Sequence, residues 1–502
     1  MGGTAGLVLG PILRRVTDDT AIIWVQTDRP AVVTVTAGPA TGSASTHALH
    51  DHHFACVRLE NLPPGQTPYE VTLDGALAWP VPDAGAPSVI RVAAPDATEV
   101  EIAFGSCRQG PAYDDPRLPP DALAAYARRA RGTRRLPDLL LLIGDQIYAD
   151  ELPSAWQQRL GRSHVVTFAE YAALYRDAWS EPDVRWLLST VPTYMIFDDH
   201  EVADDWNSSA ASVAAARRDP HWPERITAAF ESYWVFQHAG NLPDGHLPLP
   251  AELSTAQMTP SHRTHSRLER EPAYTPWSFE IETAAARVLV LDNRAGRVLE
   301  GERSMLSPQT WQWLRDRSRT DRHLLVAGPL PWLLAPAIHD AEVIWEAVGR
   351  RWPGGFTERI RAKFDFEHWS SIEASWRGLR DILTGARDSA VSVTTIGGDV
   401  HHSYVARTSV PGLLQVTCSP LRNRLSPLFR TLLEMGWWRL LAWPSRALVR
   451  LLRLPTPGLR WRTLRKPWYG SAIGTIVYNG QSRTVVLEGA AVDGTLVEVV
   501  RA

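Results

Sequence analysis

The chain has 502 residues, of which 44% are hydrophobic and 21% charged. This composition is typical of a globular protein of two or three domains and excludes a disordered or fibrous chain. The formal net charge of −3 excludes electrostatic capture of nucleic acid or anionic membrane by the molecule as a whole.

Cysteine usage and the N-terminal segment indicate the compartment. Cys56, Cys107 and Cys418 form no C-x-x-C pair and no even set, so we expect no disulfide framework. The opening segment MGGTAGLVLGPILRR carries its arginines after the apolar stretch, which is the wrong order for a secretory or twin-arginine signal. No run reaches the ~18 apolar residues that a membrane span requires. We therefore expect a cytoplasmic protein.

Residues 1–97 show short apolar segments about ten residues apart, separated by Asp, Pro and Gly. The expected strands are 21–26, 31–36, 54–59, 69–73 and 88–92. This regular spacing predicts a small all-β sandwich of the fibronectin-III or immunoglobulin kind, serving as an accessory or substrate-presenting module. Prolines 80, 82, 87 and 95 place the domain boundary near residue 97.

From residue 98 onward, apolar strands alternate with helical segments. The expected strands are 101–104, 139–143, 194–197, 288–291, 324–327 and 391–396. Each is a nearly continuous apolar run, which is typical of strands buried on both faces of an α/β sheet. Helices at 121–131 and 168–179 complete β-α-β units. The polar, Pro- and His-rich stretch 206–285 predicts an insertion or lid, and 474–500 predicts closing strands with a hairpin turn at Asn479-Gly480.

Residues able to bind metal or phosphate follow five of these strands. The segments are Gly105-Ser106-Cys107-Arg108, Gly144-Asp145-Gln146-Ile147-Tyr148, Asp198-Asp199-His200-Glu201, Asp292-Asn293-Arg294 and Gly398-Asp399-Val400-His401-His402. Strand ends of open α/β sheets converge on one face. Carboxylates and imidazoles there would form a metal centre. A single Gly-Asp pair at a strand end more often forms a turn or a helix cap than a metal site. Four such segments in one chain are hard to explain as turns alone.

Four of these segments, all except Asp292-Asn293-Arg294, occur in the order found in a known family. Together with Phe104 and Trp206-Asn207, they make residues ~100–425 resemble the alkaline phosphatase D (PhoD-like) metallophosphatases, a branch of the calcineurin-like metallophosphoesterases. The resemblance implies a four-layer α/β/β/α sandwich preceded by the β domain. It also implies a bimetal centre with His200 as the catalytic acid. The implied metal ligands are Cys107, Asp145, Tyr148, Asp199, Asp399 and His401.

The activity expected from this resemblance is hydrolysis of a phosphate monoester or diester by a hydroxide that two metals activate, with His200 protonating the leaving group. Arg108 and Arg294 either bind phosphate oxygens or form salt bridges with nearby acids. The alternative is a non-catalytic, metal-containing protein that binds a phosphate, a nucleotide or a phospholipid headgroup. His402 is expected to lie behind the ligands or to be exposed.

Ligand type predicts the metals. The thiolate of Cys107, the phenolate of Tyr148 and the carboxylates of Asp145 and Asp399 favour Fe(III) over magnesium. We expect a more labile divalent ion, Ca, Mn or Zn, at the Asp199 and His401 position.

Residues 421–466 form a basic segment with eleven Lys and Arg residues and one acid, Glu434, so its local charge is +10. The segment is rich in Leu and Trp, and Pro444 predicts that it divides into two short helices. One interpretation is a helical hairpin that packs its apolar side on the domain. The other is peripheral contact with an anionic membrane. We do not expect nucleic-acid binding.

Overall fold

The N-terminal part of the chain is an all-β domain of two antiparallel sheets, as predicted. The computed structural model describes residues 4–81, 86–250, 253, 277–352, 357, 361 and 366–502. One sheet has the order β1 (Leu7–Val16), β2 (Ala21–Thr27), β6 (His52–Leu59) and β5 (His47–Leu49). The other has the order β4 (Ala40–Ser45), β3 (Val32–Ala37), β7 (Gly65–Leu73) and β8 (Ala76–Trp79), and β9 (Val89–Val92) also pairs with β7. Ile23, Val35, Val57 and Val71 pack in the core between them.

A six-stranded mixed sheet carries the first three predicted strand ends. Its order is β12 (Thr193–Ile196), β11 (Leu139–Ile143), β10 (Glu99–Gly105), β20 (Ala472–Asn479), β21 (Ser482–Ala490) and β22 (Leu496–Arg501). Strands β10, β11 and β12 are parallel, whereas β20 pairs antiparallel with β10 in the register Ile102↔Ile476. The predicted closing strands, which come from the C-terminal end of the chain, therefore pair with β10 and extend the same sheet.

A seven-stranded sheet carries the remaining strand ends. Its order is β13 (Phe279–Glu282), β14 (Ala286–Val290), β15 (His323–Ala327), β16 (Val393–Gly397), β18 (Leu413–Thr417), β17 (Tyr404–Thr408) and β19 (Trp461–Thr463). Strands β14, β15, β16 and β18 run parallel. Their carboxyl ends therefore lie at one edge of this sheet.

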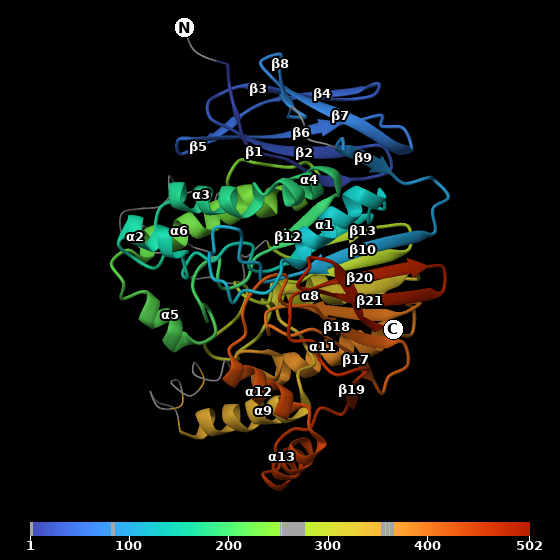
Figure 1. Cartoon of the computed structure of the whole chain (residues 1–502). Coiled ribbons are helices and arrows are strands. Elements are labelled where there is room, and N and C mark those ends of the chain that lie inside the picture. The colour runs from blue at the N-terminus through green and yellow to red at the C-terminus, as the bar shows by residue number, and fades with distance from the viewer. Residues whose placement is uncertain are drawn as a thin grey trace.

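The two sheets pack face to face between helices, which confirms the predicted four layers (Figure 1). Alternate residues of β14 show this arrangement. Val288 and Val290 join Ile102 and Leu141 in the core between the sheets, whereas Leu289 packs on the helices outside. The outer helices are α1 (Ala122–Thr133) and α4 (Pro182–Thr190) on one side and α8 (Pro308–Arg317) and α11 (Glu373–Ala386) on the other.

Part of the stretch predicted as an insertion or lid is core. Residues 222–241 form α6 (Trp222–Ser232), the π-helical turn η1 (Tyr233–His238) and η2 (Ala239–Asn241), and Phe230, Tyr233 and Phe236 are buried. The aromatic run in this otherwise polar stretch supplies the apolar surface that packs here. The helix α5 (Ala210–Ala216) precedes it and β13 joins the sheet. His262 and His265 lie outside the described residues.

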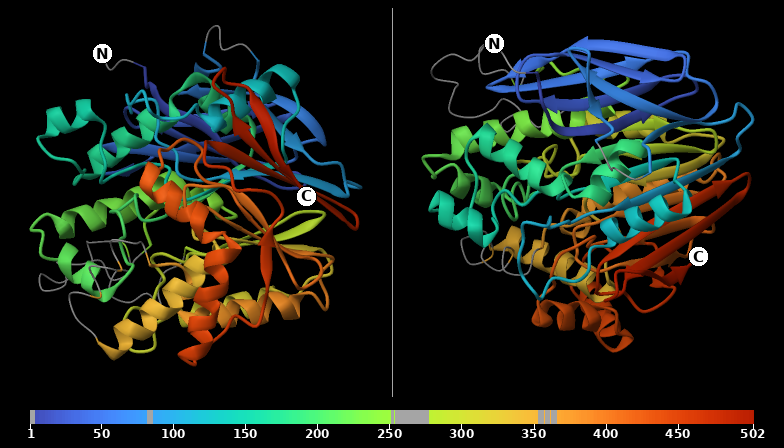
Figure 2. Two further views of the ribbon diagram at one scale, coloured as in Figure 1. Left: turned by 60° about the horizontal axis from the view of Figure 1, so that its bottom comes forward. Right: turned by 45° about the horizontal axis from the view of Figure 1, so that its top comes forward.

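The β domain packs against the α/β part through a buried contact (Figure 2). Arg14 donates hydrogen bonds to the carbonyl oxygens of Thr193 (3.0 Å) and Phe236 (2.7 Å). The rings of Trp24 and Phe54 contact Phe236, with centroid distances of 5.5 and 5.4 Å. The predicted boundary at residue 97 falls between β9 and β10.

The basic segment forms two helices, α12 (Pro427–Gly436) and α13 (Arg439–Leu451), beside α9 (Pro336–Arg351). The break lies at Trp437 and Trp438, not at the predicted Pro444, which is inside α13. A proline inside a helix removes the hydrogen bond that its N–H would donate and crowds the carbonyl group four residues earlier, yet α13 continues past Pro444. None of the described helices combines the length and apolarity that crossing a bilayer requires. The remaining helices are α2 (Ser154–Leu160), α3 (Phe168–Trp179) and η5 (Trp369–Ser371).

Candidate metal centre

The loops that follow β10, β11 and β16 hold predicted ligands in an uncommon backbone conformation. Cys107, Asp145, Asp399 and His401 have φ values of 57°, 49°, 61° and 50°. Residues other than glycine rarely adopt positive φ, and such strained positions concentrate at functional sites.

Two glycines of the motifs allow these loops to approach one another. Gly144 has φ of 117°, and a Cβ there would lie 2.8 Å from the Cβ of Asp198. A Cβ at Gly398 would lie 2.1 Å from the hydroxyl oxygen of Ser106. Any side chain at these positions would push the carboxylate-bearing loops apart.

The carboxylates of three strand ends meet in two overlapping groups. In each group one potential ligand atom per residue lies within 4.8 Å of all the others. The groups are Asp145, Asp199 and His200, and Asp145, Asp198, Asp199 and Asp399. Asp145 and Asp199 belong to both groups. Asp145 is the residue that the resemblance assigns to a carboxylate shared by two metals.

The electrostatics of these groups favour cations. Burial and neighbouring carboxylates raise the pKa of Asp145 well above its usual range, and burial raises the pKa of Asp199 to about 7. Oδ1 of Asp145 and Oδ2 of Asp198 are buried and accept no hydrogen bond from the described residues. Buried carboxylates without partners are costly unless they coordinate a metal. The donor set therefore fits a metal centre.

The other predicted ligands lie around these carboxylates, without joining the two groups that the described residues form. Tyr148 Oη lies 3.5 Å from Asp145 Oδ2. Asn423 Nδ2 donates to Tyr148 Oη (2.6 Å) and lies 3.4 Å from His401 Nε2. Cys107 Sγ lies 3.8 Å from the carbonyl oxygen of Asp399.

The protonation of these side chains depends on nearby charge. Burial, and then the negative charge of Asp145, raises the pKa of both Cys107 and Tyr148 well above the usual range. Burial also lowers the pKa of His401 to about 4, so this imidazole is neutral and able to ligate. The thiol and the phenol would ionise only beside a strong cation.

His200 is oriented by a residue that no quoted motif contains. Its Nδ1 lies 3.0 Å from Oδ1 of Asp150. Burial opposes charge on the ring, but Asp150 and Asp145 outweigh it and raise the pKa of His200 well above its usual range. A histidine held protonated next to the carboxylate groups is suited to donate a proton.

Two further residues contact this site: Glu201, which the quoted segment contains without an assigned role, and His368, which sequence analysis missed. The carboxylate of Glu201 accepts hydrogen bonds from the backbone N–H groups of Asp145 (3.2 Å), Gln146 (2.7 Å) and Asp198 (2.9 Å), so it joins two ligand loops. His368 contacts Glu342 through Nδ1 (3.0 Å) and directs Nε2 toward Oδ2 of Asp399 (3.6 Å). No sequence pattern marks His368.

The structure supports the salt-bridge interpretation of both predicted phosphate-binding arginines. Arg108 is buried and donates to Asp121 (2.9 Å) and Glu181 (2.6 Å). Arg294 is fully buried and donates to Asp198 (2.5 Å) and Glu367 (2.8 Å). Their donor groups are directed at carboxylates within the fold. His402 is also buried and stacks on Tyr404 with a centroid distance of 5.0 Å.

Because Arg294 neutralises Asp198 and Glu367, we expect Arg294→Met to lower the free energy of unfolding of the metal-free protein by about 3–5 kcal/mol. Loss of one partner leaves the other buried charges uncompensated. Urea denaturation in the presence of chelator measures this change. The matched control is Arg117→Met, which removes an exposed pair with Asp115 and should not measurably alter stability. Equal stability of the two variants would contradict this role of Arg294.

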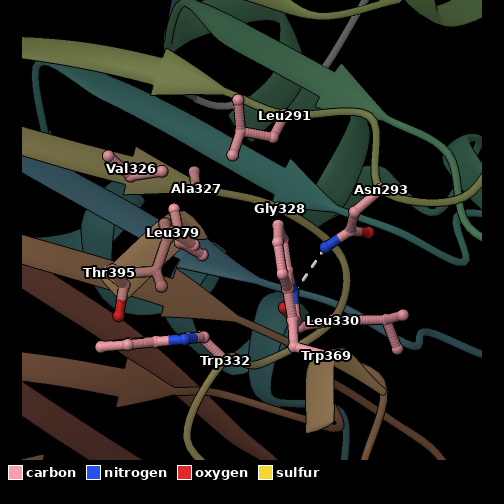
Figure 3. A pocket seen from close by; sticks show the side chains of 11 residues that line it. Leu291, Asn293, Val326, Ala327, Gly328, Leu330, Trp332, Trp369, Leu379 and Thr395 are labelled. Atoms are coloured by element: carbon pink, nitrogen blue, oxygen red, sulfur yellow. Dashed lines mark hydrogen bonds between the residues drawn. The ribbon is translucent and has the colours of Figure 1, made fainter. Parts of the chain in front are cut away.

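Asn293, between Asp292 and Arg294, lies at a separate small pocket on the outer side of the seven-stranded sheet (Figure 3). Its Nδ2 donates to the carbonyl oxygen of Leu330 (3.4 Å). Leu291, Trp332 and Trp369 also line this pocket, whose volume of about 20 Å³ has room for about one water molecule. It is too small for a phosphate ester.

Comparison with known proteins agrees with this site. A model of PhoD-like phosphatases matches residues 103–419, which contain every predicted ligand. The chain belongs to the PhoD-like phosphatase family. It is therefore a phosphoesterase of a metal-dependent family, and the expected resemblance is confirmed. A second model, a domain of unknown function (DUF7800), matches residues 4–90 of the β domain.

A solved structure of PhoD shows the same fold. It is 13% identical, covers 100% of this chain and 90% of its own, and has a TM-score of 0.61. A maltogenic amylase from S. marinus has 10% identity over 98% of this chain and 80% of its own, with a TM-score of 0.20. No curated protein matches the sequence.

Proposed function

We propose that this PhoD-like phosphatase hydrolyses phosphate monoesters or diesters at a two-metal centre built around Asp145, with His200 as the general acid. The observation that supports the proposal is the pair of overlapping groups, which share Asp145 and Asp199 and include a histidine that Asp150 contacts. The residues proposed to hold the two ions are Cys107, Asp145, Tyr148, Asp199, Asp399 and His401, and Asp198 and His368 lie beside them.

The protein's own groups account for orientation and proton transfer. Asp150 forms a hydrogen bond with Nδ1 of His200. The other ring nitrogen, Nε2, is then available to protonate the departing alkoxide. Glu201 keeps the ligand loops in register through its backbone hydrogen bonds. When bound, the metal ions supply Lewis-acid stabilisation of phosphoryl charge and a hydroxide nucleophile at neutral pH.

The donor types support the proposal of Fe(III) at the position next to Cys107 and Tyr148. A thiolate, a phenolate and carboxylates together carry several negative charges, and the raised pKa of Cys107 and Tyr148 requires a strong cation to ionise them. The Asp199 and His401 position, with a carboxylate and a neutral imidazole, suits a divalent ion such as Ca, Mn or Zn.

Hydrolysis of p-nitrophenyl phosphate and bis-p-nitrophenyl phosphate tests the function. We expect turnover of at least one ester, loss of activity with chelator, and recovery after addition of iron with calcium, manganese or zinc. Silence on both esters after every reconstitution would contradict catalysis. Phosphate or nucleotide binding by the silent protein would then identify the metal-containing binding protein of the alternative interpretation.

A further inference from the structure

Exposed apolar side chains gather on the hairpin of α12 and α13, residues 427–452. Ten of the sixteen large apolar side chains exposed in the described part of the chain lie there. They are Leu428, Phe429, Leu432, Trp438, Leu440, Leu441, Trp443, Leu448, Leu451 and Leu452. Figure 1 shows α13 projecting at the end of the molecule away from the β domain. A concentration of this kind on a protein surface marks an interaction site.

The side of α13 that faces the protein is the less apolar one. Among the side chains of α13 that the structure describes, those at least partly buried are Ala442, Ser445, Arg446 and Val449. Their spacing places them on one side of the helix. Asp340 of α9 anchors this stripe, accepting from Ser445 Oγ (2.9 Å) and Arg446 Nε (2.9 Å). The helix is therefore held with its polar anchors inward.

The outward side of α13 carries an apolar stripe. Leu440, Trp443 and Leu451 are 83%, 77% and 78% exposed, and their spacing of three and eight residues keeps them on one face. If the hairpin packed its apolar side on the domain, as one interpretation of the sequence expects, these side chains would be buried; they are exposed. Arg450 and Arg453 are also exposed beside Leu451.

We propose that this hairpin docks the protein on an anionic membrane surface, inserting the Leu440, Trp443 and Leu451 stripe at the headgroup level. Leucine and tryptophan on one face with arginines beside them are the composition of an interfacial helix. The hairpin carries four arginines and one acid, a charge of +3, and it lies within the basic segment 421–466, whose charge is +10. This positive charge is complementary to anionic lipid. It opposes a second copy of this chain as the occupant, because a symmetric contact would bring two basic segments together.

Co-sedimentation of the full-length protein with phosphatidylcholine vesicles, with and without phosphatidylglycerol, tests the proposal. We expect binding to the anionic vesicles at low salt and weaker binding at physiological salt. The variant L440S/W443S/L451S should bind at least about tenfold more weakly than the wild type. R450Q/R453Q should lose about tenfold on anionic vesicles.

The matched control is L77S/V492S/V497S, which removes three exposed apolar side chains elsewhere and should bind like the wild type. Thermal unfolding of each variant verifies folding, and ester hydrolysis should be unchanged because these residues lie outside the metal centre. Absence of wild-type binding at low salt would overturn the proposal, as would equal binding by the stripe variant. Two other outcomes, each without vesicle binding, would assign the hairpin to another partner and overturn the proposal. One is self-association of the wild type that the stripe variant abolishes, and the other is retention of the protein on RNA.

Discussion

We expect His200→Ala to lower kcat for an alkyl phosphate by about 10²–10⁴-fold while leaving the metal content unchanged. An alkoxide is a poor leaving group and needs the proton that His200 supplies. The loss should be smaller for p-nitrophenyl phosphate, whose phenolate leaves without protonation. The comparison of the two esters therefore separates loss of the acid from general damage to the site.

Two companion variants sharpen this test. His221→Ala, at an exposed histidine before α6, should retain wild-type turnover. Asp150→Asn keeps the size of the side chain but removes the charge that orients His200, so we expect a smaller loss of kcat and a shifted pH profile. Undiminished alkyl phosphate turnover by His200→Ala, with both metals present, would contradict its role as the acid.

We expect Asp145→Ala to lose both metals and to reduce hydrolysis to background, an effect at least as large as that of His200→Ala. Asp145 and Asp199 are both shared by the two groups of potential ligands, and Asp145 is the residue proposed to bridge the two ions, so its removal affects both positions. Cys107→Ala should instead lose the iron and its visible charge-transfer absorption while the divalent ion remains. Metal analysis and the absorption spectrum distinguish these two outcomes.

Asp244→Ala serves as the control for these variants because Asp244 is exposed in a loop, with a side chain 89% accessible. It should keep both metals and full turnover. Circular dichroism establishes that each variant is folded. An Asp145→Ala protein that retained both metals would contradict the shared position. A colourless, iron-free wild type with full activity would contradict the assignment of iron.

The pattern of apolar residues along the chain predicted the strands best where a strand is buried on both faces, because its apolar run is then continuous. The run of five apolar residues at 139–143 coincides with β11, and the run at 324–327 lies within β15. The polar strand β4, ATGSAS, gave no such pattern because its residues are held by pairing with β3 and not by an apolar face. The stretch 222–241 was misjudged because its aromatic residues bury against distant strands, which a local window does not contain.

The sequence by itself determined which loops carry the predicted ligands, because each chemical group follows its own strand and the glycines that permit the turn stand next to it. Only the tertiary structure decided the partners. Asp150 meets His200 across 50 residues, and Arg294 meets Glu367 across 73. It also decided that Arg108 lies in a salt bridge and that the apolar side of α13 faces outward. Residue type and spacing define which groups can interact, whereas burial and the crossing of chain segments select the groups that do.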